Sequence, residues 1–447
     1  MKSLQSLKRA PSFPTRLGES ANGRDESGEL QGGTSPSAPS AAPGIAITLR
    51  PSYLIELAAF LVVGAFCERE LLKTVGQGLE GDSIGYRQIA AHMTHLFDTD
   101  IREPIWIWFS WLFDRIWGDN PNSLRLGSMY TFIATDCLVY LLTLQVTKSR
   151  LAAVTSFLIF GLNPFLLYLG LTGNRDNMVL FSMTGLTLFS VVREFPRSSR
   201  VRLIGLTVFS VLAVGSRLSN FPGVAALLAF AAFRKYFKAR FLLVPALAVA
   251  LFVGPYIAYC KTKFNDAFIA SNVHSRWFRN YEFCYVKKTG CNGCTCNTYF
   301  NEKGDVVDPY GGGPVTTGEY VFGMHSREQL IALVTLGVST ILFSEGAYFE
   351  QLSGFHYNLI YPVYLLGIAA LLLSKRRVVL LVPLLSINLV FFTVNMMPAR
   401  IFSILSPFFA LTIAFGAAIC VSAVIGLLAL AIPRLRPFIP VTTAVWR

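Results

Sequence analysis

Long apolar stretches separated by short polar turns make up most of the chain after residue 50. The stretches lie at 53–67, 125–146, 151–171, 177–192, 202–216, 221–233, 241–259, 329–343, 357–373, 378–397 and 401–432. A helix crosses the hydrocarbon core of a bilayer with about 20 apolar residues, and the longer stretches reach that length. The pattern predicts an all-α polytopic membrane protein with a bundle of about ten transmembrane helices.

Five turns rich in Lys and Arg predict the orientation of this bundle. They lie at 148–150, 193–202, 234–240, 375–377 and 434–436. Short basic loops stay in the cytoplasm, so both termini are expected there as well. The remaining polar segments would then face outward: 68–124, 172–176, 217–220, 260–356 and 398–400. This alternation requires that the stretch 329–343 is a re-entrant or surface-lying helix.

The same pattern divides the chain into four regions. Residues 1–50 are rich in Ser, Pro and Gly and predict a disordered cytoplasmic tail. Residues 51–259 form an N-terminal transmembrane bundle that contains the first outer loop, at 68–124. Residues 260–356 form a large outer-face loop domain with cysteines and the re-entrant stretch. Residues 357–447 hold the last transmembrane helices and a short basic cytoplasmic tail.

Composition sharpens the class of protein. Only 15% of the 447 residues are charged and 53% are hydrophobic, whereas a soluble protein has about 25% charged residues. These proportions exclude a soluble enzyme and a disordered polymer. The net charge of +13 is explained mainly by the orienting turns, so it does not call for a nucleic acid partner. We therefore expect a multi-pass protein in the lipid bilayer, with a bacterial inner membrane preferred.

Four cysteines gather in the large outer loop. In an oxidising compartment such a set predicts two disulfides, whose pairing stays open among three arrangements. The spacing of the second and third also fits a zinc knuckle. In either case a structural role is expected for these residues: Cys284, Cys291, Cys294 and Cys296.

The first outer loop holds the most informative polar residues. Asp82, Tyr86 and Ala90 are spaced four apart and would share one face of a helix. An Arg-Glu-Pro motif follows at 102–104, and then a helix-length run with four tryptophans. An acid presented at the membrane surface beside tryptophans is a candidate active site. The alternative is that Asp82 caps a surface helix and the tryptophans form an interfacial belt.

Further motifs follow the first loop in a fixed order. They are Asn174-Arg175-Asp176, the segment Ser216 to Pro222, and Pro398-Ala399-Arg400. The whole order resembles the membrane-embedded GT-C glycosyltransferases, such as the 4-amino-arabinose and protein mannosyl transferases, over roughly 51–260 and more loosely over 357–432. The resemblance implies a hexosyl- or pentosyltransferase that takes its sugar from a polyprenyl-phosphate donor.

The resemblance also implies roles for individual residues. The first-loop aspartate of the family serves as the base or orients the acceptor, which implies Asp82. For the donor phosphate we expect arginines at the outer ends of the spans, because a guanidinium binds phosphate bidentately and keeps its charge. The candidates are Arg102, Arg175, Arg217 and Arg400. The alternative for each is a snorkelling side chain or an ion pair, and Arg175 could pair with its neighbour Asp176.

The remaining candidates concern the acceptor and a metal. Contact with acceptor or substrate is expected at Tyr86, Glu103, Asp176, His274, Arg276 and Trp277. No cofactor is required, although a divalent cation is a candidate at Asp82 and Glu103, since hard cations bind carboxylates. His92 and His95 are three residues apart, which predicts that one surface-lying helix carries both. The alternative is that they contact the substrate or a metal.

Together these features predict an inverting glycosyltransferase with Asp82 as base and an active site on the outer face. Its partners would be a polyprenyl-phosphate-linked sugar and a glycan, lipid or protein acceptor. The alternatives are a lipid-linked-sugar transporter or flippase, and a non-catalytic envelope assembly protein. A transporter usually places charges at mid-membrane and shows internal repeats. Here the charges gather at the outer ends and no repeat is visible, which favours the enzyme.

Overall fold

The structure is a computed structural model of the 447-residue chain. It describes residues 51–432 except 80, 119, 193–194, 197, 235–238, 274, 276–315, 333–334, 336–346 and 375–402. Residues 50–447 form one compact unit. All regular elements in the described part are helical, in agreement with the predicted all-α class. The predicted tail at 1–50 lies outside the described residues.

Most described helices belong to residues 51–264. In chain order they are α1 (Pro51–Thr74), α2 (Asp82–His92), α3 (Pro104–Trp117), α4 (Pro121–Thr147), α5 (Arg150–Gly161), α6 (Pro164–Leu171), α7 (Asp176–Val191), α8 (Ser199–Ser216), η1 (Leu218–Asn220), α9 (Phe221–Phe233), η2 (Ala239–Leu242) and α10 (Leu243–Phe264). Later come η4 (Glu319–Gly323), α13 (Ala347–Ser353), α14 (Tyr357–Leu373), η7 (Ser403–Leu405) and α18 (Ser406–Ala431).

The stretch 151–171 shows how local sequence divides an apolar run. It folds as α5 and α6, which meet at a bend of 58°. The Asn163 side chain accepts hydrogen bonds from the backbone N–H groups of Phe165 and Leu166 at 2.9 and 3.1 Å, and so caps α6. Pro164 occupies the first turn of α6, where a missing N–H does no harm. A new helix therefore begins at this point.

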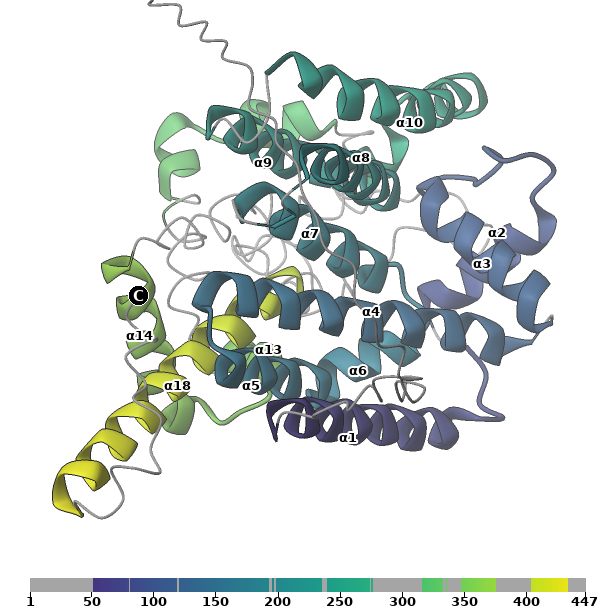
Figure 1. The fold of residues 1–447 in the computed structure, drawn as a ribbon. Helices are drawn as coiled ribbons and strands as arrows, with labels where there is room; N and C mark the ends of the chain where they lie inside the picture. The colour runs from purple at the N-terminus through teal and green to yellow at the C-terminus, as the bar shows by residue number, and fades with distance from the viewer. Residues whose placement is uncertain are drawn as a thin grey trace, which may run out of the picture. The chain divides into compact units, whose positions relative to one another are not determined.

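Helix α4 lies at the centre of the packing. It contacts α5, α6 and α7 along its length, while α8 packs between α7 and α10 (Figure 1). Helices α2 and α3 pack together at one end of this group, and α3 contacts α4 and α8. The polar loops that precede α2, α3 and α7 meet at this end of the bundle.

The described helices agree only in part with the predicted membrane spans. Among the described residues, four helices are long and apolar enough to cross a bilayer, namely α4, α8, α10 and residues 403–428, and the bent pair α5–α6 is a fifth candidate. Helices α9 and α14 are apolar but shorter. The predicted ten spans and the outer loop domain are therefore not confirmed. The stretch 329–343 is described only in part, and 378–397 lies outside the described residues.

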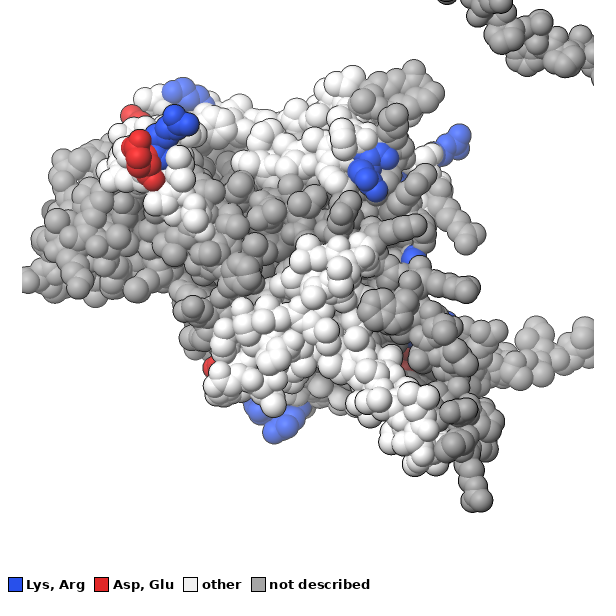
Figure 2. Space-filling model, turned by 90° about the vertical axis from the view of Figure 1, so that its left-hand side faces the viewer, with Lys and Arg blue, Asp and Glu red and all other residues white. Residues whose placement is uncertain are grey.

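The described surface is largely apolar. Figure 2 shows that one face of the molecule carries few charged residues among those described. Large hydrophobic side chains stay exposed along whole helices, for example Leu57 and Leu61 on α1 and Leu247 and Leu251 on α10. A soluble protein rarely exposes apolar patches of this extent, so the surface fits contact with lipid.

Candidate active site

Helix α2 presents Asp82 at its first residue. Gly81 precedes it with a φ of 56°, a left-handed conformation that favours glycine. Gly81, and not Asp82, thus occupies the cap position, while the Asp82 carboxylate lies in the first turn, where the helix dipole favours negative charge. Tyr86 and Ala90 follow on the same face, each 1% exposed. The prediction that these three residues share one helical face is confirmed.

Asp82 forms an ion pair with Arg102 from the loop before α3. Arg102 Nη2 lies 3.1 Å from Asp82 Oδ1. The Arg102 guanidinium also lies over the Tyr86 ring, 5.4 Å from its centroid, an attractive cation–π geometry. The two charged side chains are 30% and 29% exposed. Burial raises the pKa of the Tyr86 hydroxyl, and the nearby charges of Arg175 and Arg102 oppose this rise.

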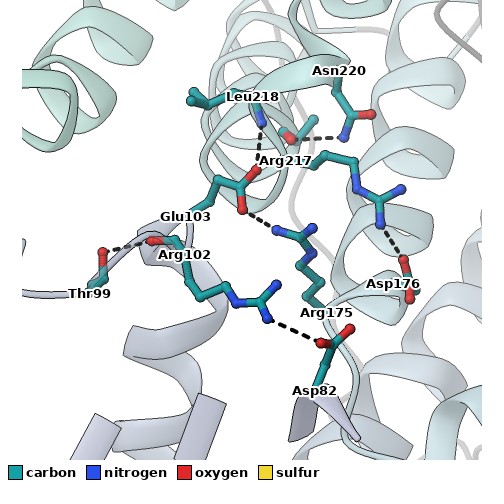
Figure 3. A network of polar contacts seen from close by, with 10 residues as sticks. Asp82, Thr99, Arg102, Glu103, Arg175, Asp176, Arg217, Leu218 and Asn220 are labelled. Carbon is teal, nitrogen blue, oxygen red and sulfur yellow. Dashed lines mark hydrogen bonds and ion pairs between the residues drawn. The ribbon is translucent and has the colours of Figure 1, made fainter. Parts of the chain in front are cut away.

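Two further ion pairs lie beside this one (Figure 3) and are buried. Arg175 bonds to Glu103, with side chains 6% and 2% exposed. Arg217 bonds to Asp176 at 2.5 Å, with side chains 10% and 6% exposed. The second Glu103 oxygen accepts the backbone N–H of Leu218 at 3.3 Å. One carboxylate therefore ties the start of α3 to the start of α7 and to η1.

The six charges form one electrostatic group. Arg175 interacts with the charges of Glu103, Asp176 and Asp82, and Arg217 with those of Asp176 and Glu103. The three carboxylates and three guanidinium groups of these pairs have formal charges that cancel. Breaking either buried pair by removing one partner would leave an uncompensated buried charge.

Neutral contacts hold the first loop against the turn at 172–176. The Trp106 indole donates to the Gly173 carbonyl at 2.9 Å, and the Ser83 hydroxyl donates to the Thr172 carbonyl. Gly173 has a φ of 72°, again in the left-handed region. The acceptors of both contacts are backbone carbonyls. No sequence motif marks such an acceptor, so neither contact is predicted from the sequence.

The predicted site residues fall into three groups according to where the structure places them. Asp82, Tyr86, Arg102, Glu103, Arg175, Asp176 and Arg217 come together at one end of the bundle. His274, Arg276, Trp277, Arg400 and the cysteines Cys284, Cys291, Cys294 and Cys296 lie outside the described residues. The expectation for His92 and His95 is wrong: α2 ends at His92. His95 lies beyond it with its ring against Tyr259, at 5.6 Å between centroids.

Asp82 and Arg102 form the partly exposed end of this cluster. Asp82 is exposed enough to accept a proton from a hydroxyl, and Arg102 can meet an anion beside it. In the described part of the chain, no three His, Cys, Asp or Glu residues converge on one point. Asp82 and Glu103, the candidates for a cation, bond instead to two different arginines.

Comparison with known proteins and the apolar helices support an integral membrane glycosyltransferase. Residues 102–259 match the family model of dolichyl-phosphate-mannose-protein mannosyltransferase. The resemblance to the polyprenyl-phosphate-dependent family is thereby confirmed over this segment, which holds five of the six paired charges, while Asp82 precedes Arg102 by 20 residues. Searches of curated proteins and of solved structures give no match.

Proposed function

We propose that the protein transfers a sugar from a polyprenyl-phosphate donor to a hydroxyl acceptor on the outer face of the membrane. The carrying observation is the contrast among the three carboxylates. Asp82 is 29% exposed and paired with an equally exposed arginine, whereas Glu103 and Asp176 are 2% and 6% exposed. Asp82 is therefore the carboxylate in this group that an acceptor can reach.

The proposed step is a single displacement. The acceptor oxygen forms a bond to the anomeric carbon, the bond from that carbon to the phosphate oxygen breaks, and the electron pair stays on the phosphate. The hydroxyl proton passes to Asp82. Since attack and departure take place on opposite sides of the carbon without an enzyme nucleophile, the configuration inverts.

Arg102 would offset the charge that grows on the leaving phosphate. A guanidinium has five N–H donors in a planar fork, so it can hold a carboxylate along one edge and a phosphate along another. Its position over the Tyr86 ring fixes the plane of this fork. Tyr86 itself is 1% exposed, so we assign it a supporting role below Arg102.

The four buried charged side chains would hold neighbouring groups in place and would not contact the substrate. Arg175 and Arg217 each engage a carboxylate in the interior, and replacing that partner by a phosphate would require the pairs to separate. We propose that they bind Glu103 and Asp176 and so hold Arg102 against Asp82. The acceptor, as a protein or glycan hydroxyl, and the sugar, with mannose as the first to test, follow the family model.

The decisive test is transfer of radiolabelled mannose from a polyprenyl-phosphate donor by the purified full-length protein. Asp82→Asn should lower the turnover by about 10²–10⁴-fold, the usual contribution of a general base. Asp100→Asn is the matched control, because Asp100 is an acid of the same loop outside the ion-pair cluster, and its φ of 53° is one that Asn adopts as well. Transfer at the normal rate by Asp82→Asn, with normal insertion into the membrane, would show that Asp82 is not the base.

A second measurement separates the enzyme from a transporter. Proteoliposomes that contain a labelled lipid-linked sugar would be assayed for movement of the label to the other leaflet without acceptor. A second sample with acceptor would be assayed for transfer. Movement in the first sample with no transfer in the second would favour the transporter. Transfer that depends on Asp82 favours the proposal.

A further inference from the structure

A groove of about 430 Å³ opens between α1, α4 and α6, outside the cluster of ion pairs. Its apolar wall includes Phe66, Leu167 and Leu171, and its polar wall includes Glu70, Lys73 and Arg125. Tyr168 at its edge is 56% exposed, so the groove communicates with the outside of the bundle. An apolar wall beside a charged one fits an amphiphile.

The groove results from how three helices diverge. Helix α1 packs chiefly against α5, and α6 departs from α5 by 58°. The C-terminal end of α1 therefore does not close against α6. Arg125, in the first turns of α4, spans part of the gap by donating to the carbonyls of Thr74, Gln77 and Gly78 at 3.0, 2.6 and 2.5 Å.

The polar wall carries a positive excess. It holds two cations, Lys73 and Arg125, and one acid, Glu70. Arg125 is 4% exposed, so its charge is little screened by solvent. Lys73 lies 2.5 Å from Glu70, but its side chain is 54% exposed, and exposed pairs of this kind are weak. Lys73 can therefore turn toward an anion.

The groove also adjoins the candidate active site. Thr172 lines it, and the Thr172 carbonyl accepts the hydroxyl hydrogen of Ser83. Ser83 directly follows Asp82 at the start of α2. A chain that lies in the groove with its charged end at Thr172 would have that end next to the first turn of α2.

We propose that this groove admits the single-chain polyprenyl phosphate of the donor, an inference that rests on the proposed function. The prenyl chain lies against α1 and α6, and the charges of Lys73 and Arg125 attract the phosphate from the bilayer toward Thr172. From there the phosphate reaches Arg102. The apolar wall, the positive excess and the contact with the Asp82 turn are the three features that select this occupant.

The test uses the full-length protein in nanodiscs of phosphatidylcholine with a photoreactive polyprenyl phosphate. Crosslinks should map to the C-terminal half of α1 and to α6. Unlabelled polyprenyl phosphate should compete, whereas polyprenol of the same length and phosphatidylglycerol should not. Crosslinks confined to other helices, or equal competition by phosphatidylglycerol, would overturn the proposal.

A pair of charge reversals on α1 supplies the matched comparison. Lys73→Glu should raise the KM for the lipid donor roughly tenfold with little change in kcat, since one basic residue near an anionic lipid contributes substantially to its attraction. Arg69→Glu makes the same change one turn earlier, at a side chain 71% exposed that does not line the groove. Equal KM values in the two variants would contradict the proposal.

The two measurements also separate this inference from the proposed function. Phosphate-specific crosslinks in the groove without any sugar transfer would retain the lipid site and reject the transferase. Normal Asp82-dependent transfer with unchanged KM in Lys73→Glu would retain the transferase and reject the groove.

Discussion

Arg175 and Asp176 are neighbours in the chain but bond to different helices. Arg175 pairs with Glu103 before α3, and Asp176 pairs with Arg217 after α8, at 2.5 Å for the second pair. Because successive side chains at a helix start point in different directions, one dipeptide joins two separate segments. The start of α7 is therefore the hub that fixes the first loop against the bundle, and its charges have structural consequences that can be measured.

The first prediction concerns the shape of the Arg102 side chain. Arg102→Lys keeps the positive charge but loses the planar fork and the stacking on Tyr86. We expect a lower kcat and a higher KM for the lipid donor, together about 10-fold to 100-fold in kcat/KM, comparable to the loss of one charge-assisted hydrogen bond. Steady-state transfer assays with varied donor measure both constants.

The control is Arg115→Lys on α3. Arg115 also lies over an aromatic ring, that of Trp111, at 5.4 Å from the centroid, but it is not part of the ion-pair cluster. The Arg115→Lys variant should leave kcat and KM unchanged. An equal loss in the two variants would mean that cation–π stacking in general, and not the position of Arg102, controls the activity.

The second prediction concerns the buried pair of Glu103 and Arg175. Glu103→Gln leaves the Arg175 charge without its carboxylate, which destabilises the fold by about 3–5 kcal/mol. Thermal unfolding in detergent should show a clear fall in the midpoint. Glu70→Gln, which removes an acid from the exposed pair with Lys73, should change the midpoint little.

A double variant tests the origin of this loss. Glu103→Leu with Arg175→Met removes both charges and should recover much of the stability, since apolar replacement of a buried pair is often neutral. It should not recover sugar transfer, because the bond from Glu103 to Arg175 would no longer hold the neighbouring Arg102 in place. If Glu103→Gln alone unfolds at the normal temperature, the pair does not bear the structural role assigned to it.

The third prediction concerns the contact of α14 with α18. A Cβ at Gly367 would lie 2.0 Å from the Thr412 carbonyl oxygen, and a backbone atom cannot move aside as a side chain can. Gly367→Ala should therefore force the two helices apart and destabilise by more than about 2 kcal/mol. Limited proteolysis and the unfolding midpoint report the loss.

The matched control lies on α18 itself. A Cβ at Gly426 meets nothing within 4 Å, so Gly426→Ala should be neutral or stabilise the helix by up to about 1 kcal/mol through its better helix propensity. A similar fall in both variants would argue against close approach of the backbones as the cause.

The fourth prediction concerns a tether between the first loop and α10. Asp98 accepts the Tyr259 hydroxyl at 2.6 Å and the Thr94 hydroxyl at 2.8 Å. The bond from Tyr259, followed by that from Thr94, holds the pKa of Asp98 well below its usual range. A depressed carboxyl pKa means that the tether is present above the ordinary pKa and is lost only as the pH falls through the lower, folded value.

Tyr259→Phe removes the largest of these contributions. The loop should loosen at every pH because this bond is gone. The pKa of Asp98 should also rise toward the ordinary value near 4, so the remaining contact with Lys263 at 3.4 Å should be lost at a milder acidity than in the unchanged protein. Hydrogen exchange of residues 93–101 between pH 3 and 6 measures this shift. Tyr168→Phe, at an exposed tyrosine on α6, should leave the exchange profile as it is.

The sequence predicted the polar cluster better than it predicted the spans. Charges are rare in the apolar chain, and the charged candidates that the structure describes converge at one end of the bundle. The spans were harder, because an apolar run does not reveal where a helix bends or ends. Asn163 and Pro164 divide one run into α5 and α6, and α7 is 16 residues long. The prediction that one helix carries His92 and His95 was wrong for a related reason, since the spacing of two residues does not show where a helix ends.

Hydrophobic periodicity and composition are properties of the chain itself, so the helical class, the apolar character of a membrane protein and the scarcity of charge can be inferred without a structure. Which charges pair follows from the fold. Arg175 pairs with Glu103 rather than with Asp176, and of the three pairs in this cluster the Asp82–Arg102 pair is the exposed one. Pairing and burial depend on where α2, α3, α7 and η1 meet in space. No spacing within the sequence encodes that distance, and it is set by the packing of the whole bundle.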